Sequence, residues 1–448
     1  MSGNHGERIQ AGSAQLRFPY DSHKRVEERA WIEARVMELA EYTDPESRGY
    51  TRLAFSKEDT LGRKAVSRFM KDAGLAVRVD AAGNIIGRMN GRQADAPIIT
   101  TGSHIDTVRE GGRFDGVAGV IAAIGAVRCL RSRDFPTQHP VEVVVFTSEE
   151  PNEFGASTVG SRAMAGTLDK RLLVTLKNKE GLSLDEAIQR VGGSAKGINE
   201  AARARGDTLA YLELHIEQGP TLDNMGIPVG VVNGIAGFAR GQVTVVGSTD
   251  HAGTTPMDVR KDALVAAAEA IQVLERVGRR KDLPNTFATI GVVENYPNAA
   301  NVVPGRVVMV TDVRNTEMEF IERAEHAFQE ELRKISTRRG VDISFDRSNI
   351  SFPVNMDTWV TGLIEESCQA CGVPYHLMTS GAGHDASHMA GITRAGMIFV
   401  PSRMGKSHCP EEWTDFGDIA LGAEILAATI FKIDERAKEV GEHGQGNC

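Results

Sequence analysis

The sequence has no basic excess, no long apolar run and no ordered set of cysteines. Its 448 residues carry a formal net charge of −9, whereas proteins that bind nucleic acids or anionic membranes present a basic face. No apolar run approaches the roughly 18 residues that span a bilayer. The five cysteines are scattered and odd in number, so they predict no disulfide framework. These absences favour a soluble, cytoplasmic protein without a nucleic-acid or membrane partner.

The composition is that of an ordinary globular chain with more than one unit. Hydrophobic residues make up 41% and charged residues 25% of the sequence, which allows a sizeable core. The start of the chain, MSGNHGERIQAGSAQL, consists mostly of small and polar residues and has no apolar segment of the kind that a signal peptide has. A disordered lead-in over residues 1–21 is therefore expected, and apolar residues at helical spacing predict a first helix over Ser22–Ala40.

Four apolar segments each run into polar residues: APIITTGSHIDTV, VEVVVFTSEE, LAYLELHIEQG and MIFVPS. The first two flank a segment of small residues, GVAGVIAAIGAVRCL, which reads as a helix. This alternation of strands and helices predicts an α/β fold built on an open sheet. Ligands of such sheets bind at the carboxyl ends of the strands, so the polar residues are expected to meet in one site.

The pattern changes near Ile235. Between there and residue 347 the order of predicted elements is βαββαβ, which is typical of a ferredoxin-like α+β unit. Helices are predicted in this stretch over Asp262–Val277 and Glu317–Ser336. We therefore expect residues 233–347 to be an inserted domain, and residues 22–232 and 348–440 to form one discontinuous catalytic domain with a mixed sheet.

The segment GSHIDTVREGGRFDG carries the first candidate ligands. His104 and Asp106 follow a predicted strand, and Asp115 lies nine residues further on, before Gly116. A metal-binding histidine needs a hydrogen-bond partner on its other ring nitrogen, which is the role we expect for Asp106. A glycine after Asp115 suits a strained backbone that aims a carboxylate inward. Without further signals, a polar turn would explain this segment equally well.

Two adjacent glutamates, Glu149 and Glu150, follow the strand VVVF. Carboxylates buried at a strand end need a compensating partner. One of them could bind a metal while the other accepts a proton from a water molecule that the metal activates. The alternative is a solvated acidic loop.

Two histidines complete the pattern, His215 at the end of LAYLELHI and His408 after MIFVPS. Either one alone is more typical of an ordinary loop or core residue. Together, the strand-end residues supply three imidazoles and two carboxylates, beside one unbound glutamate. This donor set suits two divalent cations such as Zn²⁺, Mn²⁺, Co²⁺ or Ni²⁺, and only the combination is specific.

With these motifs the chain resembles the dinuclear-metal aminoacylase/carboxypeptidase superfamily, and within it the hydantoinase/carbamoylase branch. GSHIDTV, GGRFDG, TSEEPNEFG, LELHIEQGP, HAGTTPM, ANVVPG, DVRN and GAGHDA occur in the family's order. That branch contains N-carbamoyl-L-amino-acid hydrolases, allantoate and ureidoglycolate amidohydrolases and one kind of β-ureidopropionase. Peptidases of the superfamily usually have an aspartate in place of His215, so LHIEQG favours ureido substrates.

The resemblance implies a role for each site residue. His104 and His215 would bind one metal, Glu150 and His408 the other, and Asp115 would bridge both, with Glu149 as general base. His251 would stabilise the oxyanion, and Asn301 and Arg314 would bind the substrate carboxylate. Further substrate contacts are expected from Gln218, Gly383 and His384, although His384 could instead be structural. The inserted domain would act as a lid and mediate a homodimer.

Several alternatives remain open at this point. An N-acyl-amino-acid hydrolase or a dipeptidase of the same superfamily would use the same metal ligands. A non-catalytic metal-dependent binding protein is disfavoured by the intact Glu149 and the complete ligand set. The ureido substrate, the metal, and the subunit in which His251 acts are not determined by the sequence.

Overall fold

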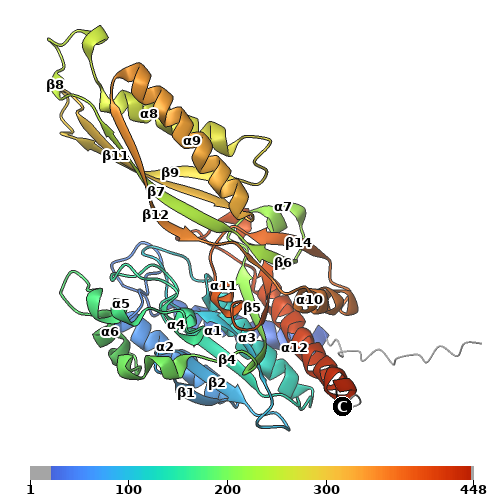
Figure 1. Ribbon diagram of the computed structural model, residues 1–448. Helices are drawn as coiled ribbons and strands as arrows, with labels where there is room; N and C mark the ends of the chain where they lie inside the picture. Colours follow the sequence, from blue (N-terminus) through green and yellow to red (C-terminus); the bar gives the residue numbers. More distant parts are fainter. Residues whose placement is uncertain (1–21, 445–448) are drawn as a thin grey trace, which may run out of the picture.

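The protein consists of two lobes that are visible in Figure 1, a larger one built on a mixed sheet and a smaller one that projects away from it. This computed structural model describes residues 22–444. The predicted lead-in, residues 1–21, lies outside the described residues. No helix of the described part is long and apolar enough to cross a membrane.

The larger lobe is organised by a nine-stranded sheet in the order β1-β2-β4-β3-β5-β15-β6-β13, with β14 paired to β6. Its central strands β4, β3, β5 and β15 run parallel to one another. Their carboxyl ends therefore meet at one edge, as the sequence predicted. The strands span Ala76–Val79 (β1), Ile85–Met89 (β2), Ile98–His104 (β3), Val141–Phe146 (β4), Thr208–Ile216 (β5), Val229–Ile235 (β6), Val354–Asn355 (β13), Tyr375–Ser380 (β14) and Arg394–Val400 (β15).

Helices cover both faces of this sheet. On one face α3 packs against β3 and β5 and against α1 and α12. A Cβ at Gly119 of α3 would lie 2.1 Å from the carbonyl oxygen of Leu214 in β5, so glycine lets this helix approach the sheet closely. The helices of this lobe are α1 (Ser22–Ala40), α2 (Lys57–Asp72), α3 (Val117–Ser132), α4 (Val159–Met164), α5 (Lys170–Thr175), α6 (Leu184–Arg190), α7 (Thr221–Met225), α10 (Thr358–Ala370), α11 (Asp385–Met389) and α12 (Phe416–Gly444).

The smaller lobe is an antiparallel sheet in the order β12-β7-β11-β9, with α8 and α9 packed against it. This strand order belongs to the ferredoxin-like arrangement, so the predicted fold class is confirmed. Beyond one end of the sheet, the short strands β8 and β10 pair and form a tip (Figure 1). The elements span Gly237–Val246 (β7), Asp250–His251 (β8), Ala263–Gly278 (α8), Phe287–Tyr296 (β9), Val302–Val303 (β10), Arg306–Asn315 (β11), Met318–Arg339 (α9) and Asp342–Ser351 (β12).

The structure differs from the sequence-based expectation in two places. β12 continues to Ser351, past residue 347, where the inserted domain was expected to end. β14 was not predicted, because its residues are mostly half-buried or exposed and give no clear apolar run. The division of the chain into domains remains a prediction.

A buried arginine connects the first helix to the loop that follows β3. Arg52 is 2% exposed. Its Nε donates to the carbonyl of Ile105 at 2.7 Å, and Nη1 donates to those of Leu39 at 2.7 Å and Tyr42 at 3.0 Å. Burial lowers the pKa of Arg52 to about 10, so the guanidinium stays charged at neutral pH. It thereby holds the loop that carries Asp106.

We expect Arg52→Met to lower the free energy of unfolding by roughly 2–4 kcal/mol, because three carbonyls, two of them in buried contacts, would lose a charged donor. Urea unfolding followed by circular dichroism measures this change. Arg48→Met is the matched control, because Arg48 is exposed. Equal stability of the two variants would contradict the assigned role of Arg52.

Candidate metal centre

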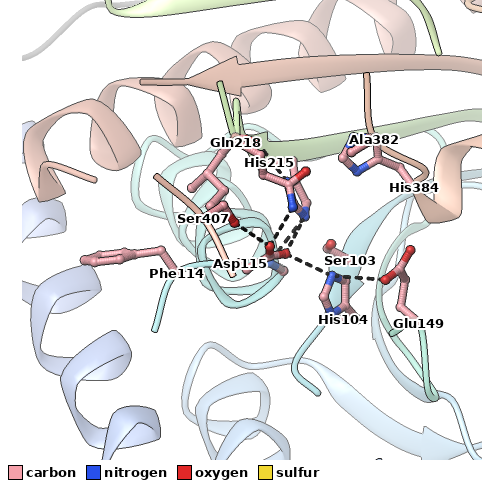
Figure 2. Close-up of polar contacts among 12 residues, drawn as sticks. Ser103, His104, Phe114, Asp115, Glu149, His215, Gln218, Ala382, His384 and Ser407 are labelled. Carbon is pink, nitrogen blue, oxygen red and sulfur yellow. Dashed lines mark hydrogen bonds and ion pairs between the residues drawn. The ribbon is translucent and has the colours of Figure 1, made fainter. Parts of the chain in front are cut away.

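The carboxylate of Asp115 lies between two groups of side chains. Its Oδ1 is 3.5 Å from Nε2 of His104 and 3.3 Å from Nε2 of His215 (Figure 2). Its Oδ2 is 3.2 Å from Nε2 of His408, which is also 3.2 Å from Oε1 of Glu150. Each group, with Asp115, is compact enough to hold a metal ion. All five predicted ligands are thus brought together, with Asp115 shared between the groups.

The sheet explains how residues so distant in sequence meet. His104 ends β3, and His215 lies near the end of the neighbouring parallel strand β5. Asp115 precedes Gly116, the N-cap of α3, which has a positive φ of 65°. A Cβ on Gly116 would lie 2.4 Å from the ring of His104. The expectation of a strained glycine after Asp115 is therefore confirmed.

Backbone groups set the orientation of two of the rings. Nδ1 of His104 lies 3.0 Å from the carbonyl of Asp106, and Nδ1 of His215 lies 3.0 Å from that of Ile216. A carbonyl only accepts, so each Nδ1 carries a proton and the Nε2 of each ring faces Asp115. A lone pair facing a carboxylate oxygen is repelled unless a proton or a cation lies between them. This geometry fits a metal ion.

The charges of the centre favour a cation as well. Burial by itself raises the pKa of Asp115, but hydrogen bonds from His104, His215 and His408 hold it well below its usual range. In return, contacts with Asp115 and Glu150 raise the pKa of His408 to about 11. Positive charge is thus stabilised at this position. Imidazole and carboxylate donors suit borderline divalent cations such as Zn²⁺.

Glu149 lies beside the centre and belongs to neither ligand group. Its Oε2 is 3.7 Å from Nε2 of His104. Its backbone follows Ser148, which has a positive φ of 55° and turns the chain at the end of β4. Burial, with Glu150, Asp385 and Asp106 nearby, raises the pKa of Glu149 well above its usual range, although His104 opposes this. The carboxylate can therefore accept a proton near neutral pH.

Asp106 is the partner of the other ring nitrogen of His104, as the sequence predicted. Its carbonyl, rather than its carboxylate, is the nearer partner of His104, since Oδ1 of Asp106 lies 3.8 Å from Nδ1 of that ring. The carboxylate accepts the backbone N–H of Glu149 at 3.2 Å and of Glu150 at 3.0 Å. Asp106 therefore links the loop after β3 to the pair of glutamates after β4.

Three of the predicted substrate contacts lie next to the centre. Nε2 of Gln218 donates to Oδ2 of Asp115 at 2.6 Å. His384 is buried, with its ring edge against His215 at a centroid distance of 4.5 Å and its Nε2 2.7 Å from Oγ of Ser380. Gly383 is exposed in the loop before α11. The structure places them close to the candidate ligands, and their contact with substrate remains a prediction.

The other three predicted residues are spread over the smaller lobe. His251 and Asn301 are exposed at the β8–β10 tip, whereas Arg314 lies at the opposite end of β11. From Arg306 to Arg314 a strand advances roughly 27 Å, at about 3.4 Å per residue. Nη1 of Arg314 donates to the carbonyl of Gly381 at 2.9 Å, next to the larger lobe. One chain therefore does not bring Asn301 and Arg314 together.

Sequence reasoning missed two polar residues of the centre, Ser407 and Glu412. Oγ of Ser407 lies 2.9 Å from Oδ2 of Asp115 and 2.8 Å from Oε2 of Glu412. Both residues are in the segment SHCPEE around His408. No signal in the sequence distinguishes the buried Glu412 from its exposed neighbour Glu411.

The sequence and the fold of this chain are both similar to those of known proteins of one family. Residues 100–432 match Peptidase family M20/M25/M40. An N-carbamoyl-L-amino acid amidohydrolase of Geobacillus stearothermophilus is 41% identical over 91% of this chain and 98% of the relative. A ureidoglycolate hydrolase of Arabidopsis thaliana is 35% identical over 90% of this chain and 86% of the relative.

A solved structure gives the same result. The crystal structure of an amidase of the hydantoinase/carbamoylase family from Burkholderia multivorans superposes with a TM-score of 0.82 at 33% identity, over 90% of this chain and 97% of that one. The family is metal-dependent, in agreement with the compact ligand groups around Asp115. The chain belongs to Peptidase family M20/M25/M40, and within it to the hydantoinase/carbamoylase branch.

Proposed function

We propose that the protein is a metal-dependent amidohydrolase that cleaves the ureido C–N bond of a small carboxylate substrate. An N-carbamoyl-L-amino acid is the first candidate, because the relative described above at 41% identity bears that activity in its name. Allantoate and ureidoglycolate are chemically similar candidates. The proposal rests on two positions in the structure. Asp115 belongs to both ligand groups, and Glu149 lies beside them without belonging to either.

In this proposal the two groups would hold two divalent ions, such as Zn²⁺, Mn²⁺, Co²⁺ or Ni²⁺. His104 and His215 would be ligands of one ion, Glu150 and His408 of the other, and Asp115 would contribute to both groups. Bound ions would polarise the ureido carbonyl and lower the pKa of a water molecule. The contacts of Nδ1 in His104 and His215 with backbone carbonyls support this assignment, since they leave Nε2 available as the donor.

Glu149 moves the proton in the proposed reaction. Its carboxylate accepts a proton from water, and the oxygen of that water bonds to the ureido carbon. One C–N bond then breaks, and Glu149 delivers its proton to the leaving nitrogen. The carbamic acid that remains loses CO₂ and thereby releases the second nitrogen. An N-carbamoyl amino acid and one water would give the amino acid, CO₂ and ammonia. Asp106 supports this step, because its carboxylate holds the backbone of Glu149.

A second copy of the chain would complete the site. Nδ1 of His251 accepts the N–H groups of Gly253 at 3.1 Å and Thr254 at 3.2 Å, so Nε2 carries the proton and can donate to an oxyanion. The tip that carries His251 and Asn301 lies far from the larger lobe, which contains the candidate metal centre of the same chain (Figure 1). A partner's tip could place its own donors beside Arg314, whose guanidinium suits a substrate carboxylate.

The edge strand of the smaller lobe supports a homodimer. β9 pairs on one side only within the described sheet, and several of its large apolar side chains are exposed, including Phe287 (66%), Val292 (45%) and Val293 (47%). A strand with one unpaired edge and exposed apolar side chains favours contact with another chain. A homodimer formed by the smaller lobes is therefore part of this proposal. Closure of the smaller lobe onto the larger one would exclude water from the active site.

The function is tested with a substrate panel. We expect the chelator-treated protein to be inactive and Zn²⁺, Mn²⁺, Co²⁺ or Ni²⁺ to restore ammonia release from N-carbamoyl-L-amino acids, allantoate or ureidoglycolate. N-acetyl-amino acids and dipeptides serve as controls. Faster cleavage of these controls would identify an N-acyl-amino-acid hydrolase or dipeptidase, and bound metal without any hydrolysis would indicate a binding protein.

The role of Glu149 has its own test. Glu149→Gln should lower kcat by about 10²–10⁴-fold, because the amide cannot accept the proton, while the metal content stays that of the wild type. Glu153→Gln is the control, since Glu153 is an exposed glutamate of the same loop. Near-normal turnover of Glu149→Gln with metal bound would refute the mechanism.

Mixing two inactive variants tests the contribution of the partner. In a heterodimer of Glu149→Gln and His251→Ala chains, one site contains neither change if His251 acts in the partner's site. Random pairing should then restore roughly a quarter of the wild-type activity. If His251 acts in its own chain, every site carries one change and mixing restores nothing, which would exclude the exchange of tips.

A further inference from the structure

Glu412 and Ser407 connect the shared carboxylate to the loop that carries His408. Glu412 is 1% exposed, and its Oε1 accepts the backbone N–H of Phe114 at 2.8 Å and of Asp115 at 3.1 Å. Its Oε2 is 2.8 Å from Oγ of Ser407, which lies 2.9 Å from Oδ2 of Asp115 (Figure 2 shows this last contact). Glu412 thus contacts Asp115 directly at the backbone and indirectly at the carboxylate.

We propose that Glu412 and Ser407 are positioning residues that hold Asp115 in the orientation in which its two oxygens face separate ligand groups. The inference rests on the proposed function, in which Asp115 contacts both metals. Neither residue belongs to the ligand set itself. Their effect would be to fix the angle of the Asp115 carboxylate and to tie it to the loop of His408.

The packing around Glu412 leaves this carboxyl little freedom. A Cβ on Gly112 would lie 1.9 Å from Oε1 of Glu412, so the backbone of Gly112 lies directly against the carboxyl. Phe114 packs edge-on against Trp413, the neighbour of Glu412, with ring centroids 5.4 Å apart. The segment before Asp115 and the segment after His408 are therefore packed together. A side chain that joins them controls the relative position of Asp115 and His408.

The hydrogen-bond pattern defines the most informative substitution. The hydroxyl of Ser407 has one proton and lies between carboxylate oxygens of Asp115 and Glu412. A glutamine at position 412 would keep one oxygen for the N–H groups of Phe114 and Asp115. Its NH₂ group would donate a hydrogen bond to Oγ of Ser407. The hydroxyl of Ser407 would then donate its one hydrogen bond to Oδ2 of Asp115. Glu412→Gln should therefore preserve the positioning, whereas Glu412→Ala should lose it.

The experiment measures metal binding separately from catalysis. Chelator-treated proteins are titrated with Zn²⁺ by calorimetry, and Co²⁺-loaded samples are compared by visible absorption, which reports ligand geometry. For Glu412→Ala we expect Zn²⁺ affinity to fall by about 10–100-fold, as for other residues that orient metal ligands, and the Co²⁺ spectrum to change. Glu412→Gln should remain close to the wild type. Glu411→Ala is the matched control, because Glu411 is exposed.

Turnover adds a second readout. With metals saturating, Glu412→Ala should lower kcat and leave KM nearly unchanged, because the proposed contacts with the substrate carboxylate lie elsewhere. Weakened Zn²⁺ binding would support the positioning role even if the wild type cleaved no ureido substrate, which separates this inference from the proposed function. Wild-type Zn²⁺ affinity and Co²⁺ spectrum in a folded Glu412→Ala protein would overturn it.

Ser407→Ala provides the test if Glu412→Ala does not fold. This variant removes the contact with Oδ2 of Asp115 and retains the backbone contacts of Glu412. We expect weaker Zn²⁺ binding with unchanged thermal unfolding of the metal-free protein. If Ser407→Ala binds Zn²⁺ like the wild type, Glu412 only stabilises the fold and the positioning role is refuted.

Discussion

The buried carboxylate of Asp115 is the constraint on which the rest of the site depends. An isolated buried carboxylate is unstable unless donors or cations compensate for lost hydration. Here the compensation comes from His104 and His215 on one oxygen and from His408, Ser407 and Gln218 on the other. Because each oxygen has its own set of partners, the carboxylate cannot rotate without losing the contacts of both oxygens. Its fixed orientation therefore defines two separate positions for cations.

The fold supplies these partners by topology. Parallel neighbours in a sheet end at the same edge, so β3 and β5 deliver His104 and His215 to one point although more than one hundred residues separate them. Gly116 and Gly119 allow α3 to start and pack where a side chain would collide with His104 or with the backbone of β5. The same helix begins directly after Asp115. The position of Asp115 is therefore a consequence of how closely the helix packs on the sheet.

The parts of the structure that could be predicted from the sequence are those with a local pattern. His104, Glu149 and His215 lie at or close to the ends of buried parallel strands, which are recognisable as apolar runs followed by polar residues. The βαββαβ order of the smaller lobe follows from alternating periodicity. Contacts that depend on three-dimensional packing could not be predicted. The carboxylate of Asp106 binds the backbone after β4, and Glu412 reaches the backbone of Asp115 from almost three hundred residues away. No spacing in the sequence encodes such contacts.

The smaller lobe shows how a motif can be local in sequence and still be divided in space. Asn301 and Arg314 are close along the chain, yet most of the length of β11 lies between them, because this strand extends from the tip to the larger lobe. A rigid antiparallel sheet cannot fold back to bring its two ends together. Residues at opposite ends can act on one substrate only if two chains exchange their tips. A substrate-carboxylate site built from both residues therefore requires an assembly, and a homodimer is the simplest assembly that supplies it.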